Sequence, residues 1–312
     1  MNDYLILLLG LLCAGGGGEL FIKGAVGAAT WARIPAGIVG ATIAAFATSS
    51  PELSVSISSA LAGTPGVALG DAIGSNVTNI GAVLGMALLI SRTWAPRESL
   101  TRDLPVALLV PIVLLLLAID GTLSRVDGLV LLALFVVWFT ASVLAALRFR
   151  ASGEEAGDLA GAKPGMAVVY GISGLVLLVL AGRFIVEGAV GIATAYGMAP
   201  YVIGATVVAL GTSVPELATT IIAKLRGHQE VALGTILGSN IFNGLLIVGV
   251  ASTIHPIPVA LTGVSAGLLT GLVLTALIVP SAGGLLKRRR GGLLVALYAV
   301  YIAMMLQMGS GH

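Results

Sequence analysis

Charged residues are scarce in this chain. They make up 10% of its 312 residues, whereas soluble domains carry about 25%. Hydrophobic residues account for 57% of the sequence, and the mean hydropathy is +1.07. These values exclude an ordinary soluble domain and predict an integral membrane protein whose main partner is the lipid bilayer. The formal net charge of +2 gives no reason to expect a nucleic-acid partner.

Cysteine and histidine are scarcer still. The single cysteine, Cys13, lies in the first apolar segment, so no intramolecular disulfide can form. Two of the three histidines, His228 and His255, fall in predicted loops, where we expect them to be solvated. The sequence shows no His/Asp metal triad and no arrangement of a nucleophile with a base, so an intramembrane hydrolase is not favoured.

The chain repeats part of its own sequence. Gly40–Leu53 reads GATIAAFATSSPEL and Gly204–Leu217 reads GATVVALGTSVPEL, with nine of fourteen positions identical. A second pair of segments, Val67–Asn79 and Val231–Asn243, follows at the same offset of 164 residues. Each residue of these signatures in the first half therefore has a counterpart 164 positions later.

Long apolar segments occur along the whole chain. A transmembrane helix needs about 20 apolar residues, and the sequence offers ten such segments. The predicted fold class is an all-α integral membrane protein with ten transmembrane helices. The predicted spans lie near residues 4–29, 36–61, 67–90, 104–119, 128–147, 166–194, 200–223, 231–253, 258–279 and 291–307.

A polar, Gly/Ala-rich linker at 148–164 divides the chain into two halves. We predict a first five-helix repeat over 1–147, with its signature at 40–79, and a second over 165–312, with its signature at 204–243. Because each half crosses the membrane an odd number of times, the second half starts from the opposite side. Such an inverted-topology repeat is typical of secondary transporters.

Lysine and arginine are distributed unevenly between the two sides of the membrane. Alternate loops place thirteen of them on one side and only Arg125 on the other. Cytoplasmic loops carry the excess of positive charge, so we predict the 148–164 loop in the cytoplasm and both termini outside. The membrane that we expect is the plasma membrane, the inner membrane of the cell.

Two acidic residues lie deep in predicted spans. Glu52 and Glu216 occupy equivalent positions in the two signatures, each within the sequence Thr-Ser-x-Pro-Glu. An intramembrane carboxylate is costly and marks a functional site by default, although a buried structural acid is the alternative. The same setting occurs twice, on repeats that we expect to meet at the midplane, and this favours a functional pair.

A proline precedes each acid. Pro51 and Pro215 have no backbone N–H, so each helix should break there and free carbonyl groups around Ala47 and Gly211. A freed carbonyl inside a membrane needs a partner, and a cation is one. The serines before each proline are candidate caps for the helix that follows.

The second signature adds neutral oxygen atoms. Ser75 and Asn79 are four residues apart, as are Ser239 and Asn243, so each pair lies on one helix face. Together the repeats offer two carboxylates, two carboxamides and four serine hydroxyls, without histidine or cysteine. Oxygen ligands suit a hard cation such as calcium, whereas zinc, copper and iron usually recruit nitrogen or sulfur. Two ionised glutamates would neutralise one divalent ion.

These paired signatures resemble the two repeats of the calcium:cation antiporter superfamily, and specifically its sodium/calcium exchanger branch. The resemblance covers both halves, and it implies two inverted five-helix repeats whose four central helices hold the cation site. Carried over by position, the implied ion ligands are Ser49, Glu52, Ser75, Asn79, Ser213, Glu216, Ser239 and Asn243. Thr48 and Thr212 are implied at sodium positions that flank the central site.

The resemblance also implies that the first and sixth helices slide across the core, which would give the glycines of Gly15–Gly18 and Gly24–Gly27 a purpose. Both helices carry charges inside their spans. Lys23 follows Glu19 by four residues, and Glu187 follows Arg183 by four. We predict that each pair forms a structural ion pair on its own helix, with a gating role as the alternative.

Two positions leave the driving ion open. Sodium-coupled members of the family generally carry an aspartate where this chain has Asn243, and the proton-coupled branch lacks that acid. The Thr-Ser-x-Pro-Glu signatures favour sodium, yet two glutamates could balance one calcium against either two sodium ions or two protons. Asp71, four residues before Ser75 and matched by Thr235, could restore the missing charge; an outer-mouth or structural role is the alternative.

We therefore expect a secondary antiporter, not an enzyme, that exchanges Ca²⁺ for Na⁺ by alternating access at one shared site. An exchanger driven by H⁺, or one that carries magnesium or manganese, is the alternative within this class. A cation channel is the alternative of another class, although broken helices in an inverted repeat favour alternating access. No cofactor is expected, since the ions are transported, and we expect the chain to work as a monomer.

Overall fold

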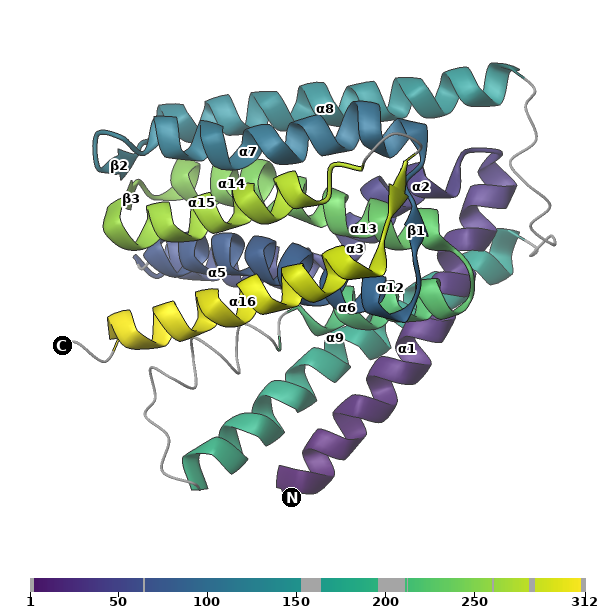
Figure 1. Cartoon of the computed structure of the whole chain (residues 1–312), viewed down its shortest axis with the longest axis horizontal. Helices are drawn as coiled ribbons and strands as arrows, with labels where there is room; N and C mark the ends of the chain where they lie inside the picture. The colour runs from purple at the N-terminus through teal and green to yellow at the C-terminus, as the bar shows by residue number, and fades with distance from the viewer. Residues whose placement is uncertain are drawn as a thin grey trace.

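The computed structural model describes residues 3–63, 65–152, 164–195, 211, 213–259, 261–280 and 284–309, and these are almost entirely helical (Figure 1). The first half contains α1 (Asp3–Ala32), α2–η1–α3–α4 (Ala36–Val39, Gly40–Ala44, Ala45–Thr48, Ser50–Leu61), α5–η2–α6 (Pro65–Thr78, Asn79–Leu84, Gly85–Ile90), η3–α7 (Ser99–Asp103, Leu104–Leu117) and α8 (Arg125–Ser152). The second contains α9 (Pro164–Ala195), α12 (Val214–Leu225), α13–η5–α14 (Gln229–Ile241, Phe242–Ile247, Val248–Ile254), α15 (Leu261–Leu277) and α16 (Arg288–Gly309). These elements form ten spans, the seventh of which is described only at Gly211 and from Ser213 onward.

The described helices agree with the predicted spans, with one difference at the end of α8. Five of them are long and apolar enough to cross a membrane by length and composition. Helix α8 continues to Ser152, so the first five residues of the predicted linker are helical. No glycine or proline interrupts this stretch, and long arginine side chains such as Arg148 and Arg150 can reach the membrane surface from a helix end. Residues 153–163 of the linker lie outside the described residues.

Two short antiparallel sheets display the inverted repeat. Strand β1 (Thr93–Trp94) pairs with β4 (Leu285–Leu286), and β2 (Thr122–Leu123) pairs with β3 (Ile257–Pro258). Strand β3 lies 164 residues after β1, so the two are counterparts. Each sheet joins one strand from each half, and β1 and β2 lie at opposite ends of the bundle (Figure 1). Two halves inserted in opposite directions produce this arrangement.

We call the end of the bundle that carries the β1–β4 sheet the basic end, because the run Lys287–Arg290 follows directly after β4. Lys224 also lies there, since its ammonium group donates to the carbonyl of Arg92 just before β1. The other end, with the β2–β3 sheet, is the opposite end.

The segments that carry the signatures occupy the middle of the bundle. Of the most apolar stretch of the span Gln229–Ile254, 94% is buried inside the protein. In the peripheral span Arg125–Ala151, the corresponding share is 22%. Helix α13 packs closely against its neighbour η1 at a glycine, since a Cβ atom on Gly238 would lie only 2.7 Å from the Cα of Ala41. The glycine of the Gly-Ser-Asn sequence thus lets another backbone come near in the second half, whereas a Cβ on Gly74, its counterpart in the first half, would meet nothing within 4 Å, so the same expectation is wrong there.

Helices α1 and α9 lie side by side and slant across the rest of the bundle (Figure 1). Glycines make the contact close, since a Cβ on Gly174 would lie 2.7 Å from the Cα of Phe21 and one on Gly17 would lie 3.0 Å from the backbone nitrogen of Leu178. The first and sixth helices are thus a tightly packed pair, which is compatible with movement as one body.

The charges on these two helices follow the prediction only in part. Glu19 and Lys23 form the expected ion pair at 3.2 Å, and Glu19 also binds Arg226, next to the end of α12, at 2.8 Å. No ion pair joins Arg183 and Glu187 among the described residues. Both side chains are exposed, so that prediction is wrong, whereas Glu19 connects α1 to the central helices.

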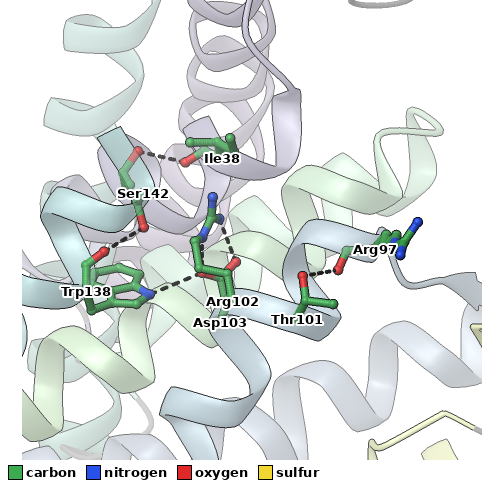
Figure 2. A network of polar contacts seen from close by, with 8 residues as sticks. Ile38, Arg97, Thr101, Arg102, Asp103, Trp138 and Ser142 are labelled. Carbon is green, nitrogen blue, oxygen red and sulfur yellow. Dashed lines mark hydrogen bonds and ion pairs between the residues drawn. The ribbon is translucent and has the colours of Figure 1, made fainter. Parts of the chain in front are cut away.

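A buried polar network holds α7 against α8 (Figure 2). Asp103 is 0% exposed, and both of its carboxylate oxygens accept hydrogen bonds from Arg102, at 2.7 and 2.8 Å. The indole nitrogen of Trp138 on α8 donates to the same carboxylate at 3.2 Å. Trp138 in turn packs edge-on against Phe242 of η5. A buried charge is tolerated when it is paired in this way, and here the pair fixes the peripheral helices to the centre.

Candidate cation site

The first signature helix breaks at Ser49, and in the second half α12 begins directly after Ser213. Ser49 separates α3 from α4 with φ −86° and ψ 6°, and Ser213 precedes α12 with φ −85° and ψ 7°. These angles lie in the sparsely populated bridge region, and they recur 164 residues apart. The break predicted from Pro51 is confirmed, because a proline cannot donate a backbone hydrogen bond. The break predicted from Pro215 stays a prediction, since residues 196–210 and 212 lie outside the described part of the chain.

The carbonyl group freed by Pro51 has a different partner from the predicted one. The hydroxyl of Ser50 donates to the Ala47 carbonyl at 2.6 Å, so a side chain of the same helix takes the place that a cation was expected to fill. The second half has Val214 at the position of Ser50 and cannot repeat this bond. Ser213 stands at the N-cap of α12, but its hydroxyl makes no capping hydrogen bond.

The carboxylate of Glu216 is held by hydroxyl groups from both halves. It accepts hydrogen bonds from Ser49 at 3.2 Å and from Ser239 at 3.4 Å, and the Thr48 hydroxyl contacts it too. Glu216 is 1% exposed. Residues of the first signature therefore complete the surroundings of the acid in the second.

Glu52, the equivalent acid, is also 1% exposed. Among the described residues, its Oε2 atom has no hydrogen-bond partner. The negative charges of Glu216 and of the half-buried Asp71 both act on it. Like charges brought together in a buried place repel each other, so the arrangement favours a cation between them.

Several other buried oxygen atoms near these acids also lack a partner, although most buried polar atoms in proteins have one. Within the described part of the chain, the partnerless oxygens of the predicted ligands are Glu52 Oε2, Ser75 Oγ, Asn79 Oδ1, Ser213 Oγ, Glu216 Oε2 and Asn243 Oδ1. Oxygen atoms alone are the donors that a hard cation takes. The described residues contain no cluster of three or more His, Cys, Asp or Glu side chains.

The two predicted amide ligands lie on π-helical turns, which sequence reasoning missed. Segment η2 starts at Asn79, and η5 spans Phe242–Ile247 around Asn243. Wider turns of this kind occur often at functional sites. Segment η2 contacts α12, and η5 contacts α4, so each amide lies beside the acid-bearing helix of the other half.

Two further asparagines join the halves at the same depth. The side chain of Asn76 donates to the backbone carbonyl of Asn240, and the side chain of Asn240 donates to that of Asn76, both at 3.1 Å. Asn79 Nδ2 also donates to Asn240 Oδ1, at 3.1 Å. This bond engages the nitrogen of Asn79, and its oxygen has no partner among the described residues. The sequence could have identified Asn76 and Asn240, because each is the last residue of a Gly-Ser-Asn sequence that occurs in both signatures.

The structure thus places most of the predicted residues together. Nine of them are at most 2% exposed: Thr48, Ser49, Glu52, Ser75, Asn79, Ser213, Glu216, Ser239 and Asn243. Asp71 lies near Glu52, and Thr212 lies outside the described residues. Their role as ion ligands stays a prediction.

Comparisons with known proteins agree with this architecture. A profile of the sodium/calcium exchanger protein family matches residues 3–144 and 166–307. The inner membrane protein YrbG of Escherichia coli is 36% identical over 72% of this chain and 71% of its own length. The sodium/calcium exchanger MaX1 of Methanosarcina acetivorans is 27% identical over 97% and 98% of the two chains.

Solved structures give the same result. The sodium/calcium exchanger from Methanococcus jannaschii superposes with a TM-score of 0.82 and 31% identity, covering 96% of this chain and 97% of that one. Both halves of the present chain are thus matched by sequence and by structure. The chain is a multi-pass membrane protein that belongs to the sodium/calcium exchanger family, a family of cation antiporters.

Proposed function

We propose that this protein exchanges Ca²⁺ for Na⁺ across the membrane at one central site shared by both ions. The observation that carries the proposal is the pair of buried acids, Glu52 and Glu216, surrounded by partnerless neutral oxygens. The relative MaX1 and the Methanococcus jannaschii structure, both named sodium/calcium exchangers, support the choice of ions.

Competition for the two acids explains the exchange. Calcium binds between Glu52 and Glu216, with the side-chain oxygens of Asn79 and Asn243 and the serine hydroxyls completing its shell. Sodium ions replace it at the same carboxylates and reach the flanking threonine positions. An unneutralised pair of carboxylates is too costly to carry through a closed, water-free state, so only a loaded site can change its access.

Charge counting bears on the driving ion. Two carboxylates balance one Ca²⁺ or two Na⁺, and a third Na⁺ leaves one excess positive charge. Asn243 is neutral, and Asp71 is the additional acid that acts on Glu52. Proton-driven exchange is the second candidate, because two protons can neutralise the same glutamates as two sodium ions.

The remaining features of the proposal concern the membrane. The basic end faces the cytoplasm, so both termini and the β2–β3 sheet face outward. The two repeats, 1–147 and 165–312, are joined by a cytoplasmic linker over 148–164 and work as a monomer in the inner membrane. The name of the Escherichia coli relative, an inner membrane protein, supports this location.

Calcium-45 uptake into proteoliposomes tests the proposal, first under an imposed sodium gradient and then under a pH gradient. We expect sodium-driven uptake that Glu52→Gln and Glu216→Gln abolish. Glu98→Gln is the matched control, since Glu98 is an exposed acid at the helical N-terminal end of η3. Uptake driven only by protons would overturn the sodium coupling. The absence of any gradient-driven uptake, or uptake that survives both buried substitutions, would refute calcium antiport.

A further inference from the structure

Three threonines next to the cation site have hydroxyl groups without a partner among the described residues. Thr219, Thr220 and Thr235 are each 0% exposed, and their Oγ1 atoms have no hydrogen-bond partner in the part of the chain that the structure describes. Other hydroxyls in the spans donate to the carbonyl four residues earlier, as in Thr42 and Ser252. A buried hydroxyl without a partner is destabilising, so these three need another explanation.

Two of these threonines face each other along one seam. The contact of Ser239 with Glu216 shows which faces of α13 and α12 meet. Thr220 follows Glu216 by four residues, and Thr235 precedes Ser239 by four, so each shares the face of its neighbour. Helices α12 and α13 are joined by a short turn and run in opposite directions (Figure 1). Thr220 and Thr235 therefore both lie one helical turn from the cation site, on the side of the basic end.

A lysine closes the seam at the next turn. Lys224 follows Thr220 by four residues and is 5% exposed. Its ammonium group donates to the carbonyl of Arg92, at 2.9 Å, and to the hydroxyl of Thr93 in β1. Among the described residues, no carboxylate forms an ion pair with it. A buried positive charge without a counter-ion repels any cation that approaches from this end.

We propose that the α12–α13 seam is the path by which ions pass between the central site and the basic end, with Thr220 and Thr235 as transient ligands and Lys224 as its gate. The inference rests on the proposed transport of cations. The threonine hydroxyls supply oxygen to an ion that has shed part of its water, which is how narrow ion paths work elsewhere. The path is closed in this conformation, because its hydroxyls are fully buried and Lys224 is bound to the β1 segment.

The equivalent positions in the first half form a seam that carries a different charge. Ser56 corresponds to Thr220, and its hydroxyl is likewise buried and without a described partner. Asp71 takes the position of Thr235, and Ala60 takes that of Lys224. The opposite-end path thus carries a negative charge and no lysine. The two paths differ by two unit charges, so the gate at Lys224 is specific to the basic end.

Cysteine labelling tests the path directly. Cys13 is the only native cysteine, so Cys13→Ala gives a background in which Thr220→Cys and Thr235→Cys can be modified by a small cationic methanethiosulfonate reagent. We expect modification from the basic end, slowed by Ca²⁺ and faster when Lys224→Ala is added. Ser252→Cys is the control, because Ser252 is buried in α14 and bonded to the Val248 carbonyl. No labelling of the two seam cysteines, or labelling only from the opposite end, would overturn the path.

Valine substitutions give an independent test, because they should lower transport without lowering thermal stability. Thr220→Val and Thr235→Val remove a hydroxyl that has no partner in the described structure, so the thermal midpoint should stay the same or rise. Transport should fall by about tenfold, the effect of about 1.4 kcal/mol on a barrier, while Thr220→Ser should retain it. Unchanged transport, or a loss of stability together with transport, would show a packing role instead. Wild-type protein without calcium uptake would instead refute the proposed function, and the labelling pattern would remain a separate result.

Discussion

Asn240 should contribute more to ion binding than its symmetry mate Asn76, although both hold the halves together. Asn240→Ala removes two side-chain hydrogen bonds, one to the Asn76 carbonyl and one from Asn79 Nδ2. Asn76→Ala removes one, to the Asn240 carbonyl. Each bond broken inside the protein leaves a buried group unpaired, at a cost of about 1–3 kcal/mol. We therefore expect a loss of about 2–6 kcal/mol for Asn240→Ala and about 1–3 kcal/mol for Asn76→Ala.

The two variants should separate further in calcium affinity. Only Asn240 accepts from Asn79, so only its removal lets the Asn79 amide rotate away from the site. The assay is thermal unfolding in detergent at increasing Ca²⁺ concentration, because a ligand that binds the folded state raises the midpoint more when it binds more tightly. We expect a weaker calcium response for Asn240→Ala than for Asn76→Ala. Equal responses would refute the idea that Asn240 orients Asn79.

Three further substitutions test separate parts of the structure. Asp103→Asn disrupts the buried pair with Arg102, so it should destabilise the fold by about 3–5 kcal/mol and leave uptake per folded molecule unchanged; thermal unfolding and uptake measure the two. Gly238→Ala places a Cβ 2.7 Å from the Cα of Ala41 and should cost about 1–3 kcal/mol, visible as a lower thermal midpoint. Asp71→Asn removes an acid that acts on Glu52 and should change the charge moved per calcium, measured as voltage-dependent flux.

Each of these three has a result that contradicts its reasoning. A midpoint for Asp103→Asn equal to that of the wild type would mean that the network in Figure 2 adds nothing to stability. An unaltered midpoint for Gly238→Ala would show that α13 and η1 can separate at no cost. The same charge per calcium in Asp71→Asn would exclude Asp71 from the stoichiometry.

Much of this protein follows from its sequence alone. The membrane location and the ten spans depend on the length of apolar runs, which any stretch of chain reports by itself. The break before Glu52 depends on a proline, whose effect is confined to its own turn. The inverted repeat is visible because the two signatures share residues at one constant offset, and an odd number of spans then dictates the opposite insertion.

Only the tertiary structure decided which polar groups meet. Asn76 and Asn240 bond across 164 residues, and Glu216 is held by a serine from the other half. Arg183 and Glu187 have the spacing of an ion pair and form none in the described structure, whereas Arg226 binds a distant glutamate. Such contacts depend on the rotation and depth at which helices pack. Sequence periodicity defines the face of one helix, but it does not encode which face of another helix lies against it.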